Sequence, residues 1–187
     1  KKSAADDIFQ GISIDANVGG TPNDNSMAIS DAGIVISAIN SNLWYFDSNT
    51  GTLLQTKSLA SLTGSSKASA FDPKVIYDPI QDRFIFIFLR DYSSSTSKIY
   101  VGFSITNNPV DGWNVYTITG NPNGIDEWSD YPSFSITDDE LFITMNLLKD
   151  NSSWELGFQE SIVWQINKDE GYNNQTLNPL LWQNIKE

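Results

Sequence analysis

The chain has 187 residues, with 11 basic and 23 acidic side chains, a formal net charge of −12 and a sequence pI near 4.2. It contains no cysteine and no histidine, which excludes disulfides, thiolate nucleophiles, Ser-His-Asp triads and His-ligated zinc within it. The acidic excess opposes binding to nucleic acid, and no apolar run of about 18 residues predicts a membrane span.

Residues 1–20 are polar, and we interpret them as an entry segment before the first repeated unit. Residues 21–60 predict a unit of four short strands, with the turn sequence DSNTG at Asp47–Gly51 between the last two. The predicted strands are Met27–Ser30, Ile34–Ile39, Leu43–Asp47 and Leu53–Ser58.

Residues 70–120 predict a second unit of the same kind. Its second strand, RFIFIFL at Arg83–Leu89, is too apolar for a half-exposed strand, which predicts burial on both faces between neighbouring units. The predicted strands are Lys74–Tyr77, Arg83–Leu89, Lys98–Thr106 and Trp113–Thr119.

Residues 128–170 predict a third unit, which contains a long connection from Leu148 to Gln159. Residues 178–187 are interpreted as the beginning of a further unit. The predicted strands of the third unit are Ser133–Thr137, Leu141–Met145 and Ser161–Asn167.

An aspartate precedes the first strand of each unit, at Asp24, Asp72 and Asp130. Recurrence of a four-strand unit at roughly 50-residue intervals is typical of an all-β β-propeller. A propeller needs about four to eight blades, and this chain provides three to four. We therefore expect the remaining blades in the same or another chain. A β-sandwich, which also has short strands at even spacing, is the alternative fold.

The three leading aspartates are predicted to converge at one mouth of a propeller channel. Carboxylates held together attract a cation, and oxygen ligands of this kind suit Ca²⁺. Asn146 would add an amide oxygen, so the predicted metal ligands are Asp24, Asp72, Asp130 and Asn146. The alternative is that each aspartate caps its own turn. Three further aspartates are interpreted as hairpin formers: Asp31, Asp78 and Asp138.

Aromatic residues in loops are the candidates for ligand binding, because loops on a rigid scaffold carry binding residues. Trp128 and Tyr131 flank Asp130, and Trp154 lies in the long connection of the third unit. The tryptophans inside predicted strands, Trp44, Trp113 and Trp164, are assigned to the core instead.

Four stretches resemble, in order, motifs of a family of secreted bacterial β-propellers, whose blades carry PPDTNG, DPVVLYD, VAVSxTxDPTGxW and DYPKLGV. The matching stretches are Thr21–Asn25, Asp72–Asp78, Gly102–Pro109 and Ser129–Pro132. The resemblance implies an exported propeller, often part of a longer surface protein and largely without assigned chemistry. Asn23 and Ser26 replace a proline and the glycine of the first motif.

Ser104–Trp113 is similar, more loosely, to the Asp-box turn of sialidases, which is structural in those proteins. Sialidases also hold the substrate carboxylate with three arginines, whereas this chain has only Arg83 and Arg90. The likeness therefore does not carry sialidase activity.

Two functions remain open from the sequence. The first is a secreted or cell-surface binding or scaffold module for a glycan or a surface protein, with structural Ca²⁺. The second is a glycan-active hydrolase or lyase that works through paired carboxylates, with Asp72 and Asp130 as conceivable partners.

Overall fold

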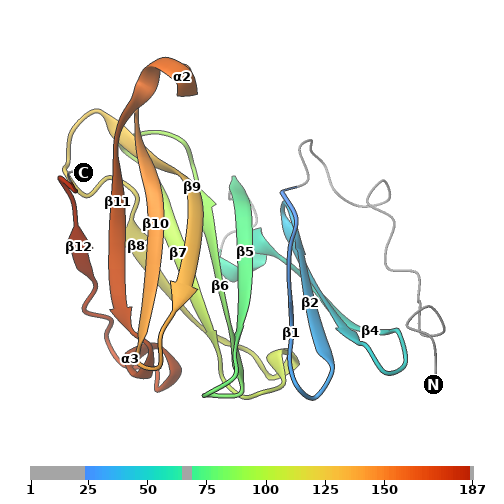
Figure 1. Ribbon diagram of the computed structural model, residues 1–187. Coiled ribbons are helices and arrows are strands. Elements are labelled where there is room, and N and C mark those ends of the chain that lie inside the picture. The colour runs from blue at the N-terminus through green and yellow to red at the C-terminus, as the bar shows by residue number, and fades with distance from the viewer. Residues whose placement is uncertain (1–23, 65–68, 186–187) are drawn as a thin grey trace, which may run out of the picture.

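The computed structural model describes residues 24–64 and 69–185, and the predicted entry segment at 1–20 lies outside them. The described residues form three four-stranded antiparallel sheets and a few short helical turns (Figure 1). The prediction of an all-β protein is confirmed. The described part of the chain forms no closed ring, so the propeller itself remains a proposal.

Each sheet is built from four consecutive strands, which lie side by side in chain order. The first sheet contains β1 (Ser26–Ile29), β2 (Ile34–Ile39), β3 (Asn42–Asp47) and β4 (Thr52–Ser58). The second sheet contains β5 (Ala70–Asp78), β6 (Arg83–Arg90), β7 (Lys98–Ser104) and β8 (Trp113–Thr119). The third sheet contains β9 (Glu127–Ile136), β10 (Glu140–Lys149), β11 (Phe158–Asn167) and β12 (Leu180–Trp182).

The helical pieces are single turns at the ends of strands: α1 (Leu59–Leu62), α2 (Trp154–Gly157), α3 (Lys168–Tyr172) and the 3₁₀ turn η2 (Pro109–Asp111). No helix in the described residues is long and apolar enough to cross a membrane. The predicted DSNTG turn between β3 and β4 is present, with the Asn49 amide donating to Asp47 Oδ1 at 2.8 Å.

The interpretation of residues 178–187 as the start of a further unit is wrong for the described part of that segment. Leu180–Trp182 forms β12, which pairs with β11 and completes the third sheet. The sequence was misleading because α3 and an Asn-rich stretch separate β11 from its partner, so that only three strands of this unit could be recognised.

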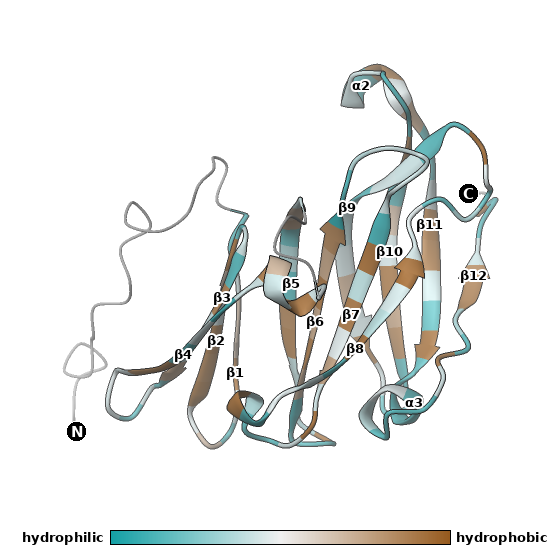
Figure 2. Cartoon of the chain, turned by 180° about the vertical axis from the view of Figure 1, so that it is seen from behind, coloured by the Kyte–Doolittle hydropathy of each residue, from teal (hydrophilic) through white to brown (hydrophobic). Residues whose placement is uncertain are grey.

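The second sheet lies between the other two and is buried on both faces, as RFIFIFL predicted. Phe84, Phe86 and Phe88 of β6 pack in one cluster with residues of the first sheet. Ile85, Ile87 and Leu89 point to the opposite face and pack in a second cluster with the third sheet. All six side chains are almost completely buried. Apolar stretches mark the strands of all three sheets (Figure 2).

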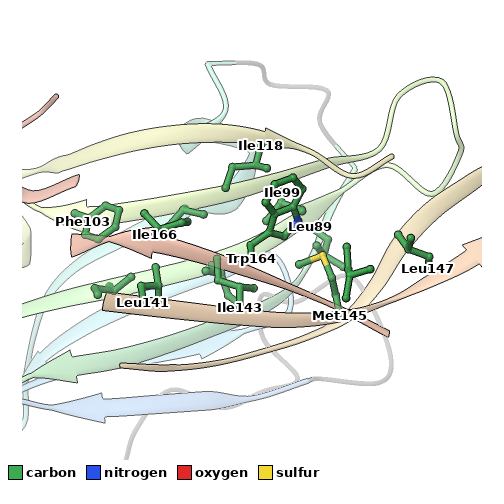
Figure 3. Close-up of a cluster of buried hydrophobic side chains, with 14 of the residues drawn as sticks. Leu89, Ile99, Phe103, Ile118, Leu141, Ile143, Met145, Leu147, Trp164 and Ile166 are labelled. Carbon is green, nitrogen blue, oxygen red and sulfur yellow. The ribbon is translucent and has the colours of Figure 1, made fainter. Parts of the chain in front are cut away.

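The cluster between the second and third sheets is drawn in Figure 3. Its members come from β6, β7 and β8 on one side and from β10 and β11 on the other, with Tyr172 of α3. The labelled side chains are Leu89, Ile99, Phe103, Ile118, Leu141, Ile143, Met145, Leu147, Trp164 and Ile166.

The first strands of the three sheets are neighbours (Figure 1). The Val75 amide of β5 donates to Ser26 Oγ of β1 at 3.1 Å, and β5 also contacts β9. The sheets therefore meet along β1, β5 and β9, whereas their last strands, β4, β8 and β12, lie at the far edges. This arrangement brings the three strand-leading segments of the sequence together.

Candidate functional site

A β-bulge with one left-handed residue interrupts the first strand of both the second and the third sheet, near the start of β5 and in the middle of β9. In β5 the pairing moves from Phe71 to Lys74, so that Asp72, with φ 51°, and Pro73 lie in the bulge. In β9 the pairing moves from Asp130 to Ser133, so that Tyr131, with φ 53°, and Pro132 lie in the bulge. Bulges of this kind redirect side chains at the ends of sheets.

This geometry corrects the expectation that Asp24, Asp72 and Asp130 occupy one repeat position. Asp24, with φ 40°, lies two residues before Ser26, the first paired residue of β1. Asp24 and Asp72 are thus equivalent to Tyr131, and Asp130 precedes that position by one residue. The sequence comparison aligned the three aspartates with one another. In β5 and β9, however, the left-handed residue of the bulge is the one that directly precedes a proline.

The three carboxylates nevertheless lie close enough to interact electrostatically. Burial, followed by the negative charges of Asp130 and Asp24, raises the pKa of Asp72 to about 6. Burial is also the main cause that raises the pKa of Asp130, with a smaller contribution from Asp24. Residues that lead or lie in the first strands of the three sheets are thus coupled electrostatically, and their convergence on one ligand stays a prediction.

The raised pKa of Asp72 has a consequence for stability. Between an ordinary aspartate pKa near 3.8 and about 6, the folded protein binds more protons at this group than the unfolded chain does. Stability must therefore fall as pH rises through that interval, and the destabilising contribution is absent below it. A cation at the site would relieve the same repulsion.

The predicted calcium ligands do not form a ready-made metal site. Within residues 24–64 and 69–185, no three acidic side chains are grouped closely enough to hold an ion. The fourth predicted ligand, Asn146, pairs with Asp130 across β9 and β10, and its Oδ1 accepts from Ser161 Oγ at 2.9 Å. Calcium binding would require the three carboxylates to turn toward one another.

A pocket of about 550 Å³ lies beside this cluster and brings together four of the seven predicted site residues: Asp130, Tyr131, Asn146 and Trp154. It is formed by β9, β10, the turn α2 and the start of β11. The turn α2, which contributes Trp154 and Glu155 to the lining, stands beyond the end of the third sheet (Figure 1). Its remaining lining residues are Leu148, Glu155 and Phe158.

The aromatic lining of the pocket is unusually exposed. Tyr131 is 73% exposed and Trp154 is 72% exposed, whereas Trp44 and Trp164 are buried in their sheets. Trp113 packs on Phe86 and donates to the Tyr45 hydroxyl at 2.9 Å. The assignment of the three strand tryptophans to the core is therefore confirmed. Trp154 is exposed, as its candidacy requires, and its binding role stays a prediction.

Trp128 does not join this pocket. It is half-buried and makes an edge contact with Tyr92, with ring centroids 6.4 Å apart. Its predicted role in the same site as Tyr131 and Trp154 has no support from the geometry. Conversely, Glu155 and Phe158 were missed, because a polar connection gives no periodic signal that would indicate which of its side chains meet.

A second polar cluster, at the opposite end of the sheets, was also missed. Asp78 ends β5 and accepts from the Ile80 amide at 3.1 Å, so its predicted hairpin role is confirmed. Its Oδ2 also accepts from Lys168 Nζ at 2.7 Å and from the Tyr172 hydroxyl at 3.0 Å. Asp78 and Lys168 are almost completely buried, and burial raises the pKa of Tyr172. This cluster fastens α3 to the second sheet, which indicates a structural role.

Comparison of the chain with family models, curated proteins and solved structures finds no match. Its function must therefore follow from its own residues. The pocket at α2 offers exposed aromatic faces beside carboxylate and amide oxygens, which are the groups that contact the apolar faces and the hydroxyls of a small polar ligand.

Proposed function

We propose that this chain is a secreted or cell-surface β-propeller module that acts as a binding domain, with a glycan as the favoured ligand. Three four-stranded sheets that meet along their first strands support a blade arrangement. Large apolar side chains are exposed on the outer sheets, including Met27, Ile29 and Leu180. In this proposal the remaining blades, in the same or another chain, cover those surfaces.

The pocket at α2 is the observation that carries the binding role. Tyr131 and Trp154 present most of their surface to solvent, and they line the same pocket as Asp130 and Asn146. Aromatic rings this exposed are expensive to leave in water and are well suited to stack on the C–H face of a sugar. The adjacent oxygens of Asp130 and Asn146 would accept hydrogen bonds from its hydroxyls. A surface protein with an extended polar segment is the other ligand of the proposal.

Trp154→Ala is expected to weaken oligosaccharide binding by roughly fivefold to a hundredfold, since loss of one stacking ring costs on the order of 1 to 3 kcal/mol. Binding would be found on an oligosaccharide array and its affinity measured by titration calorimetry. Leu156→Ala is the matched control, because Leu156 belongs to the same turn, is exposed and does not line the pocket. The glycan form of the proposal is contradicted if the chain binds no oligosaccharide on the array. It is also contradicted if Trp154→Ala and Leu156→Ala change the affinity equally.

A glycan-active enzyme is the second candidate, and the raised pKa of Asp72 beside Asp130 favours it. A carboxyl that titrates near 6 could act as a general acid while its partner is ionised. Release of new reducing ends from the bound oligosaccharide, abolished by Asp72→Asn, would establish the enzyme. Binding without turnover would establish the binding module.

Structural Ca²⁺ is a further part of the proposal, and it rests on the coupled carboxylates of Asp24, Asp72 and Asp130. We expect Ca²⁺ to raise the melting temperature and EDTA to reverse the change, with a gain of about 2.7 kcal/mol at a hundredfold excess over Kd. Asp72→Asn should weaken this response, and asparagine tolerates the positive φ at this position. Asp138→Asn, on an exposed hairpin, should not change it. A melting temperature that does not respond to EDTA or Ca²⁺ would show that no such site exists.

A further inference from the structure

The pocket at α2 carries negative charge and no positive charge. Two of its seven lining residues, Asp130 and Glu155, are acidic, and none of the described residues that line it is basic. Hydrogen bonds from Ser153 and from backbone keep the pKa of Glu155 low, so its carboxylate is ionised at neutral pH. The whole chain has a net charge of −12, which increases the negative potential around the opening.

Three aromatic side chains, Tyr131, Trp154 and Phe158, line the same pocket. They come from the bulge of β9, from α2 and from the start of β11, so they approach a ligand from three different elements. Aromatic faces attract organic cations through the quadrupole of the ring, and most strongly for tryptophan. An ionised carboxylate strengthens the attraction by a charge-assisted hydrogen bond to an ammonium group.

We propose that the pocket is selective for glycans that carry free amino groups, such as oligomers of deacetylated hexosamines. This inference rests on the proposed glycan-binding function and specifies its ligand. The aromatic rings would stack on the sugar face, and Asp130 and Glu155 would bind the ammonium groups. A neutral glycan of the same size keeps the stacking contacts and loses the ionic ones. An anionic glycan is repelled by both carboxylates.

Two probes separate the inference from the underlying function: the tetramer of glucosamine, whose nitrogens are ammonium groups, and the tetramer of N-acetylglucosamine, in which a neutral acetamido group replaces each of them. We expect the cationic tetramer to bind the wild-type chain at least about tenfold more tightly at pH 6, as measured by titration calorimetry at physiological ionic strength. Asp130→Asn and Glu155→Gln should each reduce this preference severalfold, and together remove it. The ratio of the two affinities is the readout, because loss of a hydrogen bond to the sugar hydroxyls weakens both tetramers whereas loss of a carboxylate charge weakens only the cationic one.

Asp138→Asn removes the same charge from an exposed hairpin outside the pocket and is the control for the field of the whole molecule. Far-ultraviolet circular dichroism would establish that every variant folds. Equal affinity for the two tetramers overturns the inference while leaving glycan binding intact. Equal effects of Asp138→Asn and Asp130→Asn also overturn it, because the preference would then arise from net charge. Binding of neither tetramer contradicts both the inference and the proposed function.

Discussion

Lys168→Met is expected to lower the free energy of unfolding by about 3 to 5 kcal/mol, because it leaves the buried carboxylate of Asp78 without its cation. The Tyr172 hydroxyl and the Ile80 amide would still donate to Asp78, but they do not neutralise its charge. Urea denaturation followed by tryptophan fluorescence measures the change. The double variant Asp78→Asn/Lys168→Met should recover part of the loss, since it removes the charge together with its partner.

Asp91→Asn is the matched control for this prediction. It breaks the Arg90–Asp91 ion pair, which spans 3.3 Å and is partly exposed on both sides. Such pairs contribute about 0 to 1 kcal/mol, and asparagine tolerates the positive φ of Asp91. If Lys168→Met lowers the free energy of unfolding no more than Asp91→Asn does, the Asp78 cluster is hydrated. In that case the cluster does not fasten α3 to the second sheet.

Truncation of either face of β6 is expected to be costly, because this strand lies between two packed sheets. Phe86→Ala removes a ring that packs on Trp113 at 4.6 Å, toward the first sheet, and should cost about 3 to 5 kcal/mol. Ile87→Ala removes the next side chain, toward the third sheet, and should cost about 2 to 5 kcal/mol. Thermal and urea denaturation measure both losses.

Ile80→Ala is the control for the β6 variants, since Ile80 is 58% exposed in the hairpin that leads into the strand. Its effect should lie within about 0.5 kcal/mol. The two β6 variants distinguish a three-layer arrangement from a two-layer one. In a simple two-sheet sandwich, one of the two adjacent positions faces solvent, and its truncation costs little.

The position of β6 could be predicted because its sequence is decisive. Six successive apolar residues between Phe84 and Leu89 leave no polar face, and only a strand covered on both sides satisfies that composition. The same reasoning failed for β9 and β10. Each extends well beyond its predicted bounds, because its extra residues are mostly polar and follow no alternation that the sequence alone reveals.

The types of residue in the candidate site could be predicted from the sequence, but the strand pairing that sets their positions could not. Of the seven residues chosen as exposed loop aromatics, strand-leading aspartates or their amide neighbour, four line one pocket. The bulge that places Tyr131, rather than Asp130, at the position of Asp72 depends on strand pairing across the sheet. The burial of Lys168 depends on where α3 packs, which no local pattern encodes.

The three first strands are expected to bring Asp24, Asp72 and Asp130 to one place, and the response of the Asp72 pKa to removal of its neighbours tests this. Carboxyl carbon chemical shifts followed by NMR through a pH titration in EDTA should show Asp72 titrating at about 6. Asp130→Asn and Asp24→Asn should each lower that pKa, since each removes a neighbouring negative charge. Asp138→Asn should leave it unchanged. An ordinary aspartate pKa at Asp72, unaffected by either neighbour, would contradict the convergence of the three sheets on which the proposed site depends.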